Sequence, residues 1–81
     1  MPTAIVMINV DIGKENEVAE KLLELPLVKD VYVVYGIHDI VAVVEASSMD
    51  ELRSTITDKI RKLDGVKSTM TSIVVMHKRR E

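Results

Sequence analysis

The chain repeats one pattern of strand, helix and strand, and its two copies lie 38 residues apart. The run 4–6 (AIV) corresponds to 42–44 (AVV). The apolar positions of the two helical stretches also coincide, Val18, Leu22 and Leu25 falling on Ile56, Ile60 and Leu63. Two such units with right-handed crossovers interleave into one sheet. The repeat therefore predicts a single domain over residues 1–81.

Hydrophobic periodicity assigns an element to each part of the repeat. Apolar, β-branched runs predict strands, and apolar residues at helical spacing predict helices. The strands are expected at 3–10, 29–35, 39–46 and 72–76, and the helices at 14–25 and 48–63. Only residues 36–38 separate the second and third strands, so these strands are expected to pair as an antiparallel hairpin. The fold class is α+β: a ferredoxin-like β-α-β-β-α-β plan, with a four-stranded antiparallel sheet and two helices on one face.

Residues of known capping preference mark the ends of both helices. Pro26 ends the first helix. Ser48 begins the second, and Glu51 follows at the spacing of a capping box. Asp64 and Gly65 end it, as glycine commonly does at a helix C-terminus.

The strands are apolar on both of their faces. In the first strand Ala4, Val6 and Ile8 point one way, while Ile5 and Met7 point the other. A sheet with helices on one face normally alternates apolar and polar residues, because its other face meets water. An uncovered apolar face of this size exceeds what monomers usually expose. We therefore expect two copies to pack sheet to sheet, as a dimeric α/β barrel.

Composition excludes several classes of function. The 81 residues carry a net charge of -2, which does not favour nucleic-acid binding. There is no cysteine, so disulfides and thiol chemistry are excluded. No apolar run reaches the length of a membrane span, and no secretory leader is recognisable. A cytoplasmic protein that has no contact with a membrane is expected.

Gly36, His38 and Asp39 interrupt the apolar run of the central hairpin. They form either a plain turn or the polar rim of a ligand site. A catalytic pair is disfavoured, because adjacent residues of a strand point to opposite faces. A metal site with His77 would follow no known ligand spacing. We expect no catalytic residue, no metal and no cofactor.

Hydroxyl side chains cluster in the stretch 67–73, KSTMTSI, where the last strand is expected to begin. Thr69 and Thr71 are the two threonines of this cluster. Threonine is common in strands for packing reasons alone. The hydroxyl groups could equally bind a small polar ligand. The residues by themselves leave both interpretations open.

Two segments in this order resemble the ligand-binding domain of the leucine-responsive/asparagine regulator (Lrp/AsnC) family, known as the RAM domain. They are YGIHDI at 35–40 and LDGVKSTMTSIVVM at 63–76. The resemblance extends from about residue 3 to residue 77. The helix-turn-helix domain of that family is missing, so the chain resembles a stand-alone RAM domain and direct DNA binding is not expected.

The resemblance also implies a ligand, an assembly and a partner. Members form sheet-to-sheet dimers that assemble into octamers or similar rings. Their effector is usually a free amino acid, held near the glycine–aspartate turn at a boundary between dimers. The matching ligand-binding positions here are Gly36, His38, Asp39, Thr69 and Thr71. Backbone N–H groups beside Gly36 would hold the carboxylate and Asp39 the ammonium group. Full-length Lrp/AsnC regulators are the implied partners.

Other classes of protein share this fold. Dimeric ferredoxin-like barrels include small isomerases and cofactor-free oxygenases, whose polar groups lie in a pocket between sheet and helices. A ligand-free structural module is a further alternative. ACT-type amino-acid domains usually pair side by side, which the two-sided strands disfavour. The polar groups here are expected on turns and strand ends, which favours a regulatory binding module over an enzyme.

Overall fold

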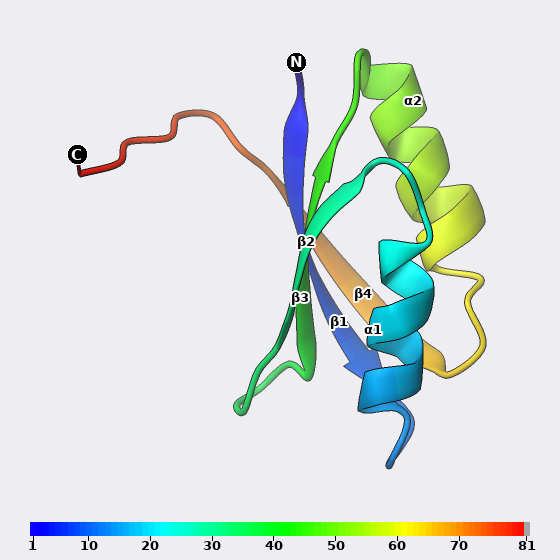
Figure 1. Ribbon diagram of the computed structural model, residues 1–81. Helices are drawn as coiled ribbons and strands as arrows, with labels where there is room; N and C mark the ends of the chain where they lie inside the picture. Colours follow the sequence, from blue (N-terminus) through cyan, green and yellow to red (C-terminus); the bar gives the residue numbers. More distant parts are fainter. Residues whose placement is uncertain (81) are drawn as a thin grey trace.

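The computed structural model describes residues 1–80 and contains one four-stranded sheet with helices on one face (Figure 1). The elements in order are β1 (Thr3–Val10), α1 (Glu15–Leu23), β2 (Val28–Val33), β3 (Ile40–Glu45), α2 (Met49–Ser54), the π-helix η1 (Thr55–Ile60) and β4 (Val66–Ile73). The strand order is β2-β3-β1-β4, and every neighbouring pair is antiparallel. This is the predicted ferredoxin-like plan.

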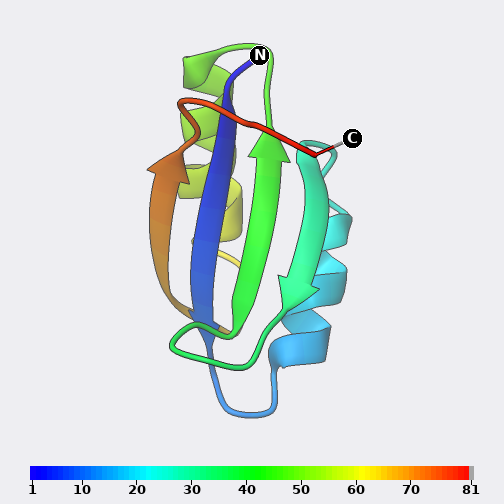
Figure 2. The same ribbon diagram turned by 90° about the vertical axis from the view of Figure 1, so that its left-hand side faces the viewer.

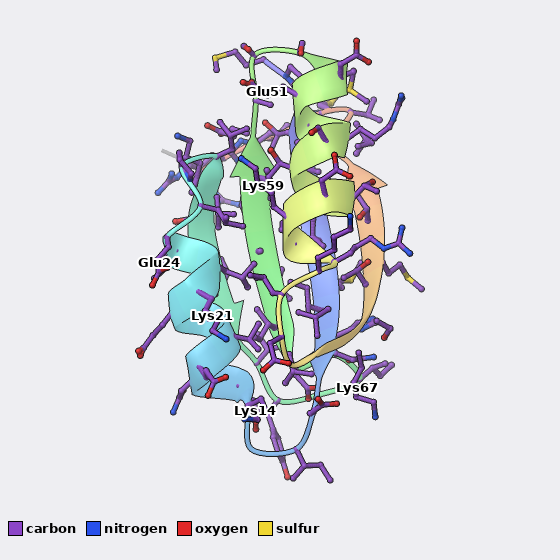
Figure 3. All side chains as sticks on the ribbon, turned by 90° about the vertical axis from the view of Figure 1, so that its right-hand side faces the viewer. Lys14, Lys21, Glu24, Glu51, Lys59 and Lys67 are labelled. Atoms are coloured by element: carbon purple, nitrogen blue, oxygen red, sulfur yellow. The ribbon has the colours of Figure 1, made fainter. Side chains whose placement is uncertain are left out.

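The core lies between the sheet and the helices. Alternate residues of β1 and β3 are fully buried on that side, and they meet Val18 and Leu22 of α1 and Leu52, Ile56 and Ile60 of the second helix. Charged residues cover the outer side of the helices, where Lys21 Nζ lies 3.4 Å from Glu17 Oε2 (Figure 3). Burial of one face of each element therefore fixes the order of the layers.

The start of α2 is capped as predicted. Ser48 Oγ accepts a hydrogen bond from the Glu51 N–H at 3.1 Å. Glu51 Oε1 reaches back to accept from the N–H and the hydroxyl of Ser47, each at 2.8 Å. These bonds lower the pKa of Glu51, because they stabilise its ionised form. The cap fixes the point at which the chain leaves β3 and enters the helix.

Ser48→Ala is expected to lower the free energy of unfolding by about 1 kcal/mol, because the Glu51 N–H would lose its acceptor. Urea denaturation of both proteins would measure the difference. Ser54→Ala is a suitable control, because Ser54 Oγ donates a hydrogen bond to the exposed side chain of Asp58 and caps no backbone N–H of the helix. Equal losses in the two variants would contradict the capping role.

Two predicted boundaries are wrong. The last strand is 66–73 rather than 72–76, so the hydroxyl cluster lies within the strand and not at its start. Ile73 pairs with Ala4 and the Val74 N–H donates to the Thr3 carbonyl, so β1 offers no further partner beyond that point. The hairpin connection is 34–39 rather than 36–38, because β2 ends at Val33 and β3 begins at Ile40.

The second face of the sheet carries no helix (Figure 2). Cross-strand partners share a face, and the register places an apolar group in the middle of this one: Ile5, Met7, Tyr32, Val41, Val43 and Met70. Ile5 is 37% exposed and Met70 is 59% exposed. The prediction that both faces are apolar is thus confirmed at the centre of the sheet. We refer to these six residues as the open face.

Candidate ligand-binding site

The loop 34–39 packs against the end of β1. The Asp39 N–H donates to the Ile8 carbonyl at 3.0 Å, and the Val34 N–H donates to the Asp39 carbonyl at 2.9 Å. These two bonds hold the end of the loop. Between them the chain is exposed, with Tyr35 and Ile37 almost fully accessible. In Figure 1 the loop leans away from the helices, toward the side of the open face.

The Asp39 carboxylate has one structural contact. Its Oδ2 accepts a hydrogen bond from the Val10 N–H at 2.9 Å, beside the irregularity in β1–β4 pairing between Asn9 and Val10. The other oxygen, Oδ1, makes no hydrogen bond within residues 1–80. One oxygen of Asp39 therefore holds the loop to the sheet, and the other can accept a bond from a ligand.

Two polar atoms beside this loop have no partner. Asn9 Oδ1 and His38 Nδ1 are both buried and make no hydrogen bond within residues 1–80. The Asn9 amide is weakly held, donating from Nδ2 to Ser68 Oγ at 3.4 Å. Buried polar atoms without partners cost stability unless water, a ligand or another chain completes them. Their position marks this end of the sheet as a place for a polar contact from outside.

Gly36 has no steric constraint within the protomer. A Cβ atom there would meet nothing within 4 Å. Its backbone does not lie in the left-handed region, unlike that of Gly65 with φ +97°. At Gly65 a Cβ atom would approach Val18 Cγ2 to 3.0 Å. The protomer alone therefore requires glycine at Gly65 and not at Gly36.

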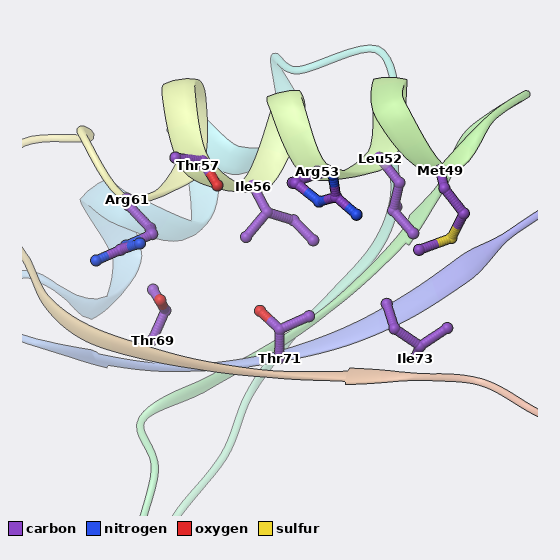
Figure 4. Close-up of a pocket in the computed structure, with 9 residues that line it drawn as sticks. All are labelled: Met49, Leu52, Arg53, Ile56, Thr57, Arg61, Thr69, Thr71 and Ile73. Atoms are coloured by element: carbon purple, nitrogen blue, oxygen red, sulfur yellow. The ribbon is translucent and has the colours of Figure 1, made fainter.

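Thr69 and Thr71 lie on the other side of the sheet from the loop. Their β1 partners, Ile8 and Val6, are buried beneath the helices, so both threonines face the helices. There they line a groove of about 460 Å³ between β4 and the second helix (Figure 4). One chain therefore does not bring the two threonines together with Gly36, His38 and Asp39.

The groove contains groups that the sequence alone did not reveal. Besides the two threonines it is lined by Met49, Leu52, Arg53, Ile56, Thr57, Arg61 and Ile73. The two arginines belong to the series Met49, Arg53, Thr57 and Arg61, whose members are four residues apart, and this helical spacing is the signal that could have placed them on one face. Which face that is depends on the packing of the helix, and the sequence does not specify this.

The described residues offer no metal site. Within residues 1–80 no three His, Cys, Asp or Glu side chains come close enough to hold an ion. His77 lies in the segment after β4 and forms no such group with His38 and Asp39. No helix in this range is long and apolar enough to cross a membrane.

The sequence model of one protein family, the Lrp/AsnC ligand binding domain, matches residues 3–80 of this chain. The chain belongs to the Lrp/AsnC ligand-binding domain family. An uncharacterised HTH-type transcriptional regulator of Pyrococcus furiosus is 41% identical over 76 residues, which cover 94% of this chain and 51% of that regulator. This Lrp/AsnC domain thus spans about half the length of the curated relative. The resemblance predicted from the sequence is confirmed.

Two solved structures show the same fold. The crystal structure of FFRP-DM1 is 44% identical with a TM-score of 0.89, and the match covers 93% of this chain and all of that one. A transcriptional regulator of Neisseria meningitidis, solved as a complex with L-Met, is 16% identical with a TM-score of 0.85. That match covers 98% of this chain and 53% of the regulator. The Lrp/AsnC domain here therefore corresponds in length to one known chain and to half of another.

Proposed function

We propose that this Lrp/AsnC domain is a cytoplasmic regulatory module that binds a free amino acid and assembles with itself. The observation that carries the proposal is the Asp39 carboxylate, which has one oxygen held by the Val10 N–H and the other free. It lies in the loop that resembles the effector-binding turn of the family. The unpartnered atoms of Asn9 and His38 next to it supply further polar contacts for a zwitterion.

The ammonium and carboxylate groups of an amino acid are complementary in charge to the groups around the loop 34–39. The free Asp39 oxygen can accept a hydrogen bond from the ammonium group, and such charge-assisted bonds are the stronger kind. Exposed N–H groups beside Gly36 can donate to the carboxylate. The N. meningitidis regulator with this fold was solved with L-Met, which supports an amino acid as the ligand class.

A neighbouring copy is needed for Thr69 and Thr71 to contribute to the same ligand. Within one chain these threonines face the helices, while the loop leans toward the open face. A site at a boundary between dimers would combine the loop of one copy with the groove of another. Homodimers that join into an octamer or a similar ring would provide such boundaries.

The open face supports the dimer. It is an apolar patch at the centre of an uncovered sheet, and the segment after β4 extends on the same side, with Val75 95% exposed (Figure 1). Packing two such faces together would remove both from water. Sheet-to-sheet pairing also completes both layers of the α/β barrel.

The proposal assigns regulation rather than catalysis to the domain. Its family consists of transcriptional regulators, and the groups beside the loop form no nucleophile and base pair. The partners we propose are full-length Lrp/AsnC regulators, which would share this assembly surface. Amino-acid binding would then shift the population of mixed and pure assemblies.

Calorimetric titration of the protein with each of the twenty amino acids tests the effector proposal. A saturable heat with one amino acid, or with a group of similar ones, is expected. The absence of heat for all twenty at millimolar concentration would contradict it and favour a purely structural module. Light scattering during the titration would show whether binding changes the size of the assembly.

The 81-residue chain is expected not to bind duplex DNA specifically at physiological salt. Its net charge of -2 provides no general attraction for phosphates. An electrophoretic mobility shift assay would check this by comparing a duplex that carries the operator of a full-length Lrp/AsnC regulator with a scrambled duplex. A shift by the pure protein that prefers the operator would contradict the prediction. A shift that appears only with an added full-length Lrp/AsnC regulator would support the proposed partnership.

A further inference from the structure

We infer that the segment after β4, residues 74–80, is an arm that binds the second copy of the chain in the sheet-to-sheet dimer. Its basic end, residues 78–80 (KRR), pairs with Asp30 and Glu45 of that second copy. The inference rests on the self-assembly proposed above, and it adds the charged contact that holds the two sheets in one orientation. We refer to residues 74–80 as the arm.

The arm leaves the sheet on the side without helices and makes little contact with its own chain. Its first residue is held by the bond from the Val74 N–H to the Thr3 carbonyl at 2.9 Å. Every later residue through 80 is exposed, and Val75 and Met76 are 95% and 72% accessible. In Figure 1 the arm runs away from the sheet, opposite the helices, and in Figure 2 it passes in front of the strands. It therefore projects, with two apolar side chains in water, into the space that a second copy would take.

Two carboxylates lie on the same side of the sheet as the open face. Asp30 is the cross-strand partner of Val43, and Glu45 follows Val43 by two residues on β3, so all three point to that side. Neither carboxylate forms an ion pair within residues 1–80. No lysine or arginine takes part in the cross-strand pairs of this sheet. A second sheet packed here would take the carboxylates partly out of water, which costs stability unless cations of the same interface pair with them.

The arm begins at the end of the sheet where these carboxylates lie. Glu45 pairs with Thr3, the residue whose carbonyl also holds the start of the arm. The edge strands of the sheet are β2 and β4. A two-fold axis along the barrel brings the same ends of both sheets together, with the β4 edge of one copy beside the β2 edge of the other. The arm that continues β4 then reaches Asp30 on β2 of the second copy, and symmetry makes the contact twice.

The basic end of the arm has no counter-charge in its own chain. Residues 78–80 form no ion pair within residues 1–80, although Glu45 lies across Thr3 from the point where the arm begins. The reason is the direction of the arm, which rises from the sheet and does not fold back over it (Figure 1). Opposite charges on one interface fix its register and exclude other arrangements. The unpaired cations of the arm and the unpaired carboxylates of the sheet therefore complement each other between two copies.

Charge reversal in two separate variants of the whole chain tests the inference. The arm variant carries Lys78→Glu, Arg79→Glu and Arg80→Glu, and the sheet variant carries Asp30→Lys and Glu45→Lys. Each variant alone is expected to raise the dissociation constant of the dimer at least about tenfold in sedimentation velocity, because like charges then face each other. An equimolar mixture is expected to form a heterodimer within about threefold of the wild-type dissociation constant, because both arm contacts again join opposite charges.

The double variant Glu20→Lys, Glu24→Lys is the matched control for the sheet variant. It reverses two exposed carboxylates at α1, on the helix side of the molecule (Figure 3). It should dimerise like wild type and should not restore association of the arm variant. Circular dichroism would confirm that each variant keeps its fold. If the sheet variant unfolds, Asp30→Asn with Glu45→Gln replaces it, and arm reversal in that background should change the dissociation constant less than about threefold.

The outcomes separate this inference from the proposed function. If wild type forms a dimer and both variants dimerise as tightly, the arm takes no part in the interface, and the inference is wrong while self-assembly stands. If each variant is weakened but the mixture is not restored, the arm contacts its own chain, and the inference is wrong again. A wild-type protein that stays monomeric contradicts self-assembly itself, and the inference fails with it. Restoration in the mixture alone would support the contact between copies.

Discussion

Ile5→Lys is expected to raise the dissociation constant of the dimer at least a hundredfold, or about 2.7 kcal/mol. Ile5 lies on β1 in the open face, with Val43 and Ser72 as its cross-strand partners. No acidic side chain stands directly opposite it on either neighbouring strand. A lysine there would bring an unpaired charge into an apolar interface, which costs several kcal/mol unless the charge reaches water. Sedimentation velocity over a range of concentrations would measure the effect.

Ile12→Lys is the matched control for this experiment. It makes the same substitution in the β1–α1 turn, at a side chain that is fully exposed. It should leave both assembly and secondary structure unchanged. A wild-type protein that sediments as a monomer at micromolar concentration would contradict the dimer proposal directly. If Ile5→Lys and the wild-type protein dimerise with the same dissociation constant, the dimer interface does not lie on the open face.

The order of the strands and helices could be predicted because local patterns determine it, whereas the π-helical turn Thr55–Ile60 inside the second predicted helix could not. Apolar residues at helical spacing, Ser48 with Glu51, and the glycine at Gly65 each specify structure within a few residues. The two copies of the pattern then leave few ways to connect the strands. The fold therefore follows from information that is close together along the chain.

The end of the last strand could not be predicted in this way. SIVVM at 72–76 has the composition of a strand, yet β4 stops at Ile73, where β1 has no more residues to pair with. The polar residues 67–71, which precede SIVVM, form most of β4 because β1 supplies backbone hydrogen-bond partners for nearly the whole of that stretch. Pairing is a long-range property, and it outweighs local propensity at an edge strand.

The candidate site shows the same division between local and long-range information. The loop with Asp39 was found from its interruption of an apolar run. The groove was not found, because its arginines join Thr69 and Thr71 only through packing of the second helix over β4. A resemblance to a family names residues, but it does not state which side of the sheet each one faces.

Asp39→Asn is expected to weaken binding of the effector amino acid tenfold to a hundredfold, about 1.5–3 kcal/mol. The asparagine carbonyl can still accept the hydrogen bond from the Val10 N–H, so the loop keeps its attachment to β1. What the substitution removes is the negative charge that pairs with the ammonium group. Titration calorimetry with the amino acid that binds the wild-type protein would measure the change in affinity.

Two further variants serve as controls for the Asp39→Asn experiment. Asp64→Asn makes the same chemical change at an exposed turn before β4, and it should leave affinity unchanged. Asp39→Ala removes the Val10 contact as well, so it should lower thermal stability in addition to affinity, whereas Asp39→Asn should lower affinity alone. If Asp39→Asn binds the amino acid as tightly as wild type while Asp39→Ala is destabilised, Asp39 serves only to attach the loop. The ammonium group of the effector would then need a different acceptor.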